Sequence, residues 1–135
     1  MEDFFKNLEP RLLWEHFYHI TQIPRCSGHE DRIREYVIKI AERNGLTYKV
    51  DTIGNILVKK PAGQGLTNST SIALQAHLDM VCEKNPGVKH DFNKDPIQIK
   101  KEGNDWIAAK GTTLGADNGI GVATVLAVLE SQDLQ

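Results

Sequence analysis

The residues best suited to chemistry begin with His77-Leu78-Asp79, which places an imidazole two residues before a carboxylate at the end of an apolar run. In an extended backbone, residues two apart lie on the same face, so the two side chains can meet. The end of a strand is also where open α/β sheets usually carry their sites. One chemical use is a metal-binding His77 whose second ring nitrogen donates to Asp79. The tripeptide alone favours the alternative, a hydrogen-bonded histidine beside a turn-forming aspartate.

A second candidate is the glycine-rich segment 115–121, which carries Asp117 directly before a predicted helix. Three interpretations remain open: Asp117 ligates a metal, Asp117 caps the helix, or the backbone amides of the turn bind a phosphate. The phosphate interpretation has weak support, because segment 110–113 lacks the Gly-Lys-Ser/Thr order of a P-loop. The Asp117 carboxylate would also repel an anion, although a cation could reconcile the two.

Together, His77 and Asp117 offer an imidazole nitrogen and a carboxylate oxygen, which are donor types of zinc sites. A catalytic zinc usually has three protein ligands and a water, so further donors are required. The other histidines fall in positions that are ordinarily solvated: His16, His19, His29 and His90. Any of the four could be recruited as a further ligand, but we favour their interpretation as solvated side chains.

The two cysteines, Cys26 and Cys82, lie far apart and are not embedded in a repeated Cys/His spacing. We interpret both as free thiols. The first residues lack the basic start and apolar core of a secretory signal, which predicts a cytoplasmic location.

These candidate residues must be positioned by a few short elements. Three-and-four spacing of apolar residues predicts a helix over about 8–20 and another over about 30–43. Ser27 and Glu30 form the pattern of a capping box at the start of the second helix, and Asn44-Gly45 supplies its stop. A last helix is predicted from about Asn118, with no stop signal before Leu134-Gln135.

Between these helices the sequence predicts strands. Segments 46–50 and 55–59 flank a turn, and segments 97–101 and 106–109 flank another, so each pair indicates a hairpin. Segment 72–77 has the composition of a buried central strand. The order favours an α/β fold with a mixed sheet flanked by helices. Because the last helix would need further strands beyond it, we expect residues 1–135 to be the N-terminal part of a longer protein.

Composition excludes two classes of function. The chain has 135 residues, 40% of them hydrophobic, with 16 Lys+Arg against 18 Asp+Glu and a formal net charge of −2. The basic residues are scattered rather than clustered, which argues against nucleic-acid binding. The apolar, uncharged run from Asn118 to Leu129 is shorter than the roughly 18 residues that a membrane-spanning helix needs.

Four blocks of sequence, in this order, resemble one known family. The blocks are Ile23-Pro24-Arg25-Cys26-Ser27, Ala76-His77-Leu78-Asp79-Met80-Val81, His90-Asp91-Phe92 with Lys94-Asp95-Pro96-Ile97, and Gly111-Thr112-Thr113-Leu114-Gly115-Ala116-Asp117-Asn118-Gly119-Ile120-Gly121. They are similar to those of the aminoacyl-histidine dipeptidases, also called cytosolic non-specific dipeptidases or peptidase D, a branch of the M20 metallopeptidases. The resemblance covers nearly the whole chain from residue 5 onward.

The resemblance implies a role for each candidate residue. His77 would bind one metal ion, Asp117 would bridge two zinc ions, and Asp79 would be a catalytic residue that orients the His77 ring without touching metal. It also implies a cis peptide bond between Asp117 and Asn118. Cobalt or manganese are possible substitutes for zinc.

The same resemblance implies an activity and an incomplete chain. The activity is hydrolysis of Xaa-His and other dipeptides by a zinc-bridged water, with a glutamate as general base. That glutamate, the later Asp and His ligands and a lid or dimerisation domain would lie beyond residue 135, and Glu130 is wrongly placed to replace the base. We therefore expect the complete enzyme to be a homodimer, and this chain alone to be inactive and prone to self-association. The alternatives are a truncated non-catalytic remnant, or a weak metal- or anion-binding module.

Overall fold

The structure is a computed structural model that describes residues 3–63, 65–66 and 68–132. Its elements, in chain order, are one 3-10 helix, three α-helices and four strands: η1 Asp3–Asn7, α1 Arg11–Thr21, α2 Asp31–Arg43, β1 Thr47–Val50, β2 Ile56–Lys59, β3 Ile99–Glu102, β4 Trp106–Ala109 and α3 Ala116–Glu130. In the described part of the chain, no helix is both long and apolar enough to cross a membrane.

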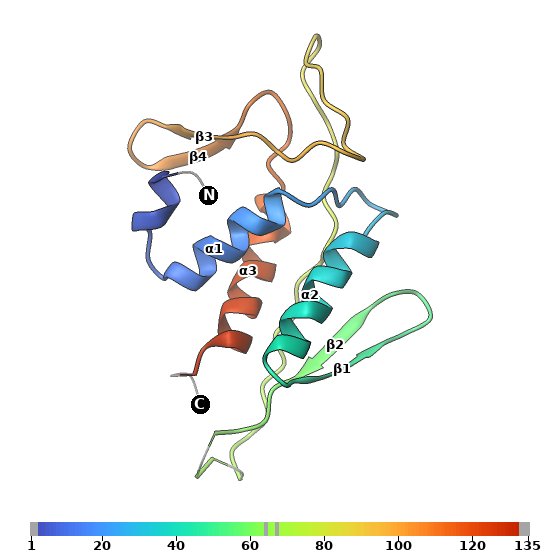
Figure 1. The fold of residues 1–135 in the computed structure, drawn as a ribbon, viewed down its shortest axis with the longest axis vertical. Coiled ribbons are helices and arrows are strands. Elements are labelled where there is room, and N and C mark those ends of the chain that lie inside the picture. The colour runs from blue at the N-terminus through green and yellow to red at the C-terminus, as the bar shows by residue number, and fades with distance from the viewer. Residues whose placement is uncertain (1–2, 64, 67, 133–135) are drawn as a thin grey trace.

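Helices α1 and α3 cross at the centre of the molecule, and α2 lies beside them (Figure 1). Phe17 and Ile20 of α1 pack in one buried cluster with Val122 and Leu126 of α3. The three-and-four spacing of α2 places Ile33, Val37, Ile40 and Ala41 on its buried face, as the sequence predicts. The core therefore lies among the helices.

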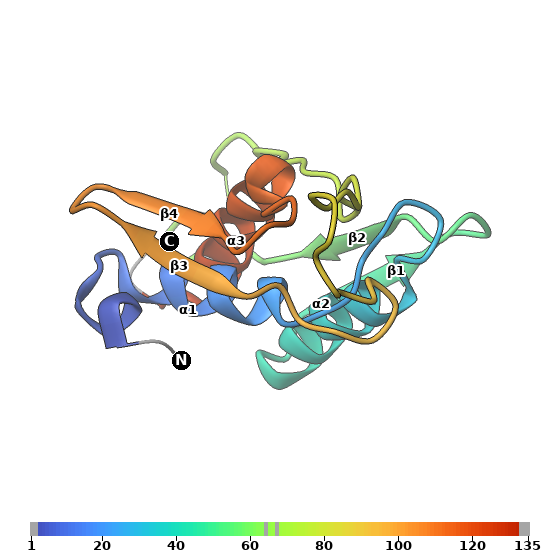
Figure 2. The ribbon, with the colours of Figure 1, turned by 90° about the horizontal axis from the view of Figure 1, so that it is seen from above.

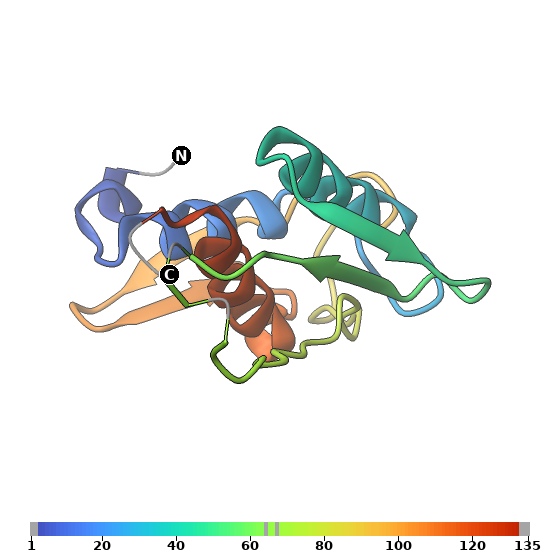
Figure 3. The ribbon, with the colours of Figure 1, turned by 90° about the horizontal axis from the view of Figure 1, so that it is seen from below.

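The strands form two separate antiparallel hairpins within the described residues. Strands β1 and β2 pair with Thr47 opposite Lys59, and β3 and β4 pair with Ile99 opposite Ala109. The hairpins lie at opposite ends of the helical layer (Figures 2 and 3). Both predicted hairpins and the α/β class are confirmed, but the strands do not form one continuous mixed sheet.

The predicted central strand over residues 72–77 is not formed; this prediction is wrong. An apolar sequence makes a strand only when a neighbouring strand accepts and donates its backbone hydrogen bonds. Among the described residues, β2 pairs with β1 alone and nothing pairs with 72–77. The segment is irregular and mostly exposed, and Ile72 is 85% exposed.

The ends of two helices depart from the sequence prediction. Helix α2 begins at Asp31 with Glu30 at its N-cap and without a side-chain cap, and the Ser27 hydroxyl bonds to Asp79 instead, so the predicted capping box is not formed. Helix α3 ends at Glu130, and the Lys60 ammonium donates to the Val128 carbonyl in its last turn at 2.8 Å. A cation there is favourable because the free carbonyls carry partial negative charge. Residues 133–135, over which the sequence gives no stop signal, lie outside the described residues.

Candidate functional site

The two chemical motifs of the sequence meet at His77. Its Nδ1 lies 3.0 Å from Oδ1 of Asp79, and its Nε2 lies 3.1 Å from Oδ1 of Asp117, a residue 40 positions away. The side chains of His77 and Asp117 are 48% and 95% exposed. The imidazole is therefore held between two carboxylates at the surface.

The surroundings shift the pKa values of this group. The hydrogen bond with Asp117, and then that with Asp79, raises the pKa of His77 above its ordinary value. The hydroxyl of Ser27 donates to Oδ2 of Asp79 at 2.5 Å, and this bond, with that from His77, lowers the pKa of the Asp79 carboxyl. Asp79 is thus an ionised acceptor toward the imidazole.

The backbone at the start of α3 explains why Asp117 is available. Asp117 and Asn118 have non-helical dihedral angles, and the Asn118 side chain accepts the Gly121 amide at 3.0 Å. Asn118, rather than Asp117, therefore caps the regular helix. The peptide bond between these two residues is cis, which confirms the prediction. With its capping role taken by Asn118, the Asp117 carboxylate points to His77 and solvent.

Two long-range pairings bring the motifs together. Lys84 and Thr112 form an antiparallel bridge, and the Thr113 hydroxyl donates to the Val81 carbonyl at 2.6 Å. The chain then turns at Gly115, whose φ of +72° is the left-handed region that favours glycine. A Cβ at Gly115 would also lie 2.7 Å from Sδ of Met80, so the turn packs directly on the segment that follows His77.

Cys26 and Cys82 form a disulfide; their interpretation as free thiols is wrong. The Met80 amide donates to the Arg25 carbonyl at 3.0 Å, and Cys26 and Met80 form a parallel bridge. This pairing brings the two cysteine Cα atoms to 5.6 Å, within the range that a disulfide spans. Their sequence separation of 56 residues concealed the contact.

The remaining histidines take no part in the site. His19 and His29 are exposed and His90 is half-buried. His16, expected to be solvated, is instead buried between Tyr36 and Glu130. No group of three or more His, Cys, Asp or Glu side chains among the described residues could hold a metal ion.

Sequence reasoning also missed two residues of the site, Arg25 and Ser27. Ser27 bonds to Asp79, and the buried Arg25 guanidinium bonds to main-chain carbonyls on both sides of the site. Both lie in the first of the four family-like blocks, from which the sequence predicts a helix cap at Ser27 but no residue of the site. The resemblance of that block to the family was the sequence signal that could have pointed to them. Their partners, however, become known only from the fold.

The donor pair fits a metal ion in chemistry and in spacing. Zinc binds imidazole nitrogen and carboxylate oxygen at about 2.0–2.2 Å, so tetrahedral geometry separates two donors by roughly 3.4 Å. The separation of His77 Nε2 and Asp117 Oδ1 is 3.1 Å. The pair nevertheless supplies only two of the ligands that a stable site needs.

Comparison with known proteins gives two close similarities. The chain is 49% identical over 127 residues to the cytosol non-specific dipeptidase of Escherichia coli (strain K12), a match covering 94% of the chain and 26% of that protein. The crystal structure of aminoacylhistidine dipeptidase from Vibrio alginolyticus superposes with a TM-score of 0.91 at 46% identity, covering 96% of the chain and 26% of that protein. The chain is thus similar, over nearly its whole length, to about a quarter of each of these dipeptidases. No family model matches the sequence.

The relationship to the dipeptidases confirms the resemblance seen in the four blocks. The similarity extends over both the sequence and the fold. The chain spans about a quarter of the length of these relatives.

Proposed function

We propose that this chain forms part of the catalytic domain of a zinc-dependent dipeptidase that cleaves Xaa-His and other dipeptides. The observation that carries the proposal is the His77 imidazole, with one nitrogen on the Asp79 carboxylate and the other on the Asp117 carboxylate. Support also comes from the similarity to two dipeptidases over nearly the whole chain.

Each side chain has a distinct role in this proposal. Nε2 of His77 and the Asp117 carboxylate would hold a metal ion, and the Asp117 carboxylate would be shared with a second ion. Asp79 accepts a hydrogen bond from Nδ1, which fixes the ring orientation and leaves Nε2 to bind metal. Bound zinc would polarise the peptide carbonyl and lower the pKa of water. A metal ion at Nε2 would compete with a proton at the same nitrogen, so binding would weaken as the pH falls.

We further propose that the 135-residue chain alone has almost no peptidase activity. His77 and Asp117 are two donors, whereas a catalytic zinc needs about three protein ligands. The described residues contain no cluster that would complete the set. The missing ligands and the general base would come from a segment corresponding to the rest of the relatives.

The glycine-rich turn is a poor phosphate cradle. Asp117 lies at the turn with a 95% exposed side chain, so its negative charge faces any anion that approaches these amides. The exposed carboxylate and the neighbouring imidazole favour a cation instead.

A complementation experiment tests the proposed function. The chain would be mixed with a fragment of the Escherichia coli relative that lacks the matched 127 residues, and hydrolysis of a Xaa-His dipeptide measured with added zinc. We expect activity from the mixture but not from either part. His77→Ala and Asp117→Asn should abolish it, whereas the control His19→Ala, at an exposed histidine of α1, should not. Activity of the chain alone that disappears in His77→Ala would contradict the inactivity, and activity insensitive to both site variants would contradict the site.

A further inference from the structure

Arg25 is a buried charged residue that bonds to both halves of the candidate site. Its side chain is 1% exposed. Nη1 donates to the carbonyl oxygens of Leu78 and Asp79 at 2.8 and 2.9 Å, and Nη2 donates to the carbonyl oxygen of Gly115. One guanidinium thus joins the backbone beside His77 to the turn that precedes Asp117.

The Arg25 backbone is attached to the first of these segments. Its carbonyl accepts the Met80 amide at 3.0 Å, and the adjacent Cys26 is joined to Cys82 by the disulfide. The side chain therefore starts from a fixed point beside segment 78–82. From there it reaches across to Gly115, which is 90 residues away in the sequence.

Two glycines, Gly115 and Gly119, leave room for the Arg25 guanidinium. A Cβ atom at Gly115 or at Gly119 would lie 2.5 or 2.8 Å from Nη2 of Arg25. The glycines on both sides of Asp117 therefore allow the guanidinium to approach the start of α3. A planar fork with five donors can reach carbonyls in two directions, which the single ammonium of a lysine does less well.

Burying the charged guanidinium of Arg25 costs free energy unless its hydrogen bonds compensate for the lost water. Desolvation lowers the pKa of Arg25 to about 10, with an opposing attraction from Asp79. Its hydrogen-bond partners are main-chain carbonyls rather than a carboxylate. A buried charge is retained when its hydrogen bonds fix a specific arrangement, and here the arrangement is the meeting of two site segments.

We propose that Arg25 is a positioning residue that sets the distance between His77 and Asp117 by joining the carbonyls of Leu78 and Asp79 to that of Gly115. The inference rests on the proposed function, because it assigns the 3.1 Å spacing of the two donors to this guanidinium. Arg25 would act through the backbone carbonyls that it holds, and not on a metal ion or substrate.

The test compares Arg25→Lys and Arg25→Met with Ile40→Ala, a buried control in α2 on which the site does not depend. The first readout is the affinity for Co²⁺, measured from its visible absorption on titration of the oxidised chain mixed with the complementing Escherichia coli fragment, which would supply the further ligands. We expect at least a tenfold loss in Arg25→Met, a smaller loss in Arg25→Lys, and less than a twofold change in Ile40→Ala. If Arg25→Met does not fold, Arg25→Lys carries the comparison.

The second readout needs no metal. Native-state hydrogen exchange of the Met80 and Gly119 amides reports the two joined segments, because these amides bond to the Arg25 and Gly115 carbonyls. We expect both to exchange at least tenfold faster in the Arg25 variants, beyond the change in global unfolding seen in Ile40→Ala. Slower or unchanged exchange would overturn the inference.

These readouts separate the two proposals. Equal Co²⁺ affinity in the unaltered chain and in His77→Ala would defeat the proposed metal site, and the exchange data alone would then decide the role of Arg25. Co²⁺ affinity that depends on His77 but is unchanged in both Arg25 variants would defeat the positioning role. A loss of affinity in Ile40→Ala as large as that in Arg25→Met would show that Arg25 acts only through stability.

Discussion

At the scale of single residues, the role of Asp79 can be tested directly through its effect on metal affinity. Asp79 receives hydrogen bonds from His77 and Ser27, so its carboxylate links the imidazole to the segment after α1. The ring would otherwise rotate about its side-chain bonds. Because the orientation of a ligand affects its affinity, Asp79 can influence metal binding without contacting metal.

We predict that Asp79→Ala weakens Co²⁺ binding by about 10–100-fold, the usual effect of losing such a partner. The measurement is a Co²⁺ titration followed by visible absorption. Asp105→Ala, at an exposed aspartate in the turn between β3 and β4, is the matched control and should bind as the unaltered chain does. Equal affinity in both variants would remove Asp79 from the site.

His16, unlike the exposed His77, is buried. Its Nδ1 lies 2.8 Å from the Tyr36 hydroxyl and its Nε2 lies 2.6 Å from Glu130. The contacts suit a neutral ring that accepts from the Tyr36 hydroxyl at Nδ1 and has Nε2 beside the Glu130 carboxylate. Burial lowers the pKa of His16, despite the opposing effect of Glu130, and burial raises that of Tyr36 to about 12, so its hydroxyl stays a donor.

We predict that His16 makes the folded chain less stable in mild acid. An unfolded histidine titrates near pH 6.5 and folded His16 titrates lower, so its contribution is complete above pH 6.5. It is lost as the pH falls from 6.5 through the folded pKa, because the unfolded state binds the proton first. Urea unfolding between pH 5 and 8 measures the fall in the free energy of unfolding. This fall should be smaller in His16→Phe and unchanged in His19→Gln, the control at an exposed histidine. An identical pH profile in His16→Phe would contradict the assignment.

At the scale of elements, helices and hairpins followed from the sequence because their signals are local. The apolar spacing of α2 and the stop at Gly45 both depend on residues within a few positions of each other. The turn of the first hairpin is equally local, because the Asp51 side chain accepts the amides of Ile53, Gly54 and Asn55. The His77–Asp117 contact came from the resemblance and was not evident from spacing.

The features that sequence reasoning missed all depend on partners far along the chain. Ser27 fits a capping box locally, yet Asp79 is a charged acceptor for its hydroxyl. His16 is buried because α2 and α3 bring Tyr36 and Glu130 to it. Segment 72–77 lacks the neighbouring strand that its composition requires. Periodicity carries no information about such contacts.

The disulfide between Cys26 and Cys82 should stabilise the fold. It joins positions 56 residues apart, and a closed loop of that size stabilises by about 4 kcal/mol in the chain-entropy model. We expect a dithiol reductant to lower the free energy of unfolding by about 2–4 kcal/mol, measured by urea denaturation. The double variant Cys26→Ser with Cys82→Ser should be equally destabilised and insensitive to the reductant. Two reactive thiols in the untreated, denatured chain would contradict the bond.

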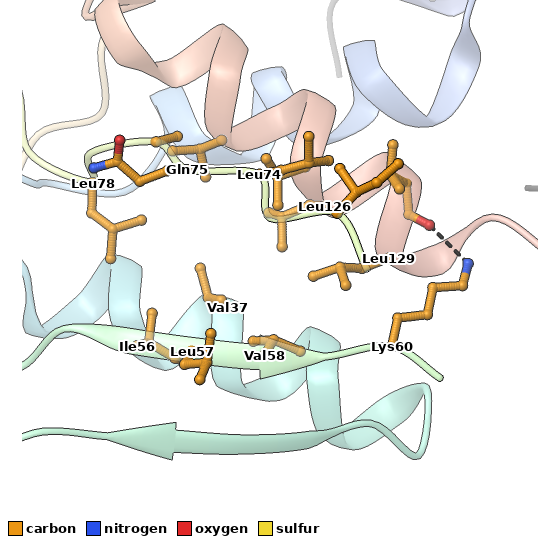
Figure 4. A pocket seen from close by; sticks show the side chains of 15 residues that line it. Val37, Ile56, Leu57, Val58, Lys60, Leu74, Gln75, Leu78, Leu126 and Leu129 are labelled. Carbon is orange, nitrogen blue, oxygen red and sulfur yellow. Dashed lines mark hydrogen bonds between the residues drawn. The ribbon is translucent and has the colours of Figure 1, made fainter. Parts of the chain in front are cut away.

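At the scale of the whole molecule, an apolar groove separates β2 from segment 72–78. Figure 4 shows Ile56, Leu57 and Val58 on one side, Leu74 and Leu78 on the other, and Val37 and Leu126 nearby. Both backbones that border the groove lack a strand partner on this side within the described residues. Unpaired backbone beside exposed apolar side chains favours association with another chain.

We predict that the chain associates reversibly with itself through this groove. Leu57 and Leu74 line it and are 68% and 54% exposed, so burial in an interface would remove their apolar surface from water. Sedimentation velocity over a range of concentrations should show a rising mean mass for the unaltered chain. Leu57→Lys and Leu74→Lys should shift the rise to higher concentration, because a lysine in the groove would have to be desolvated. Ile53→Lys, at an exposed apolar residue in the hairpin turn, changes charge equally outside the groove and should leave association intact. Equal loss in all three variants would mean that net charge, rather than the groove, controls the association.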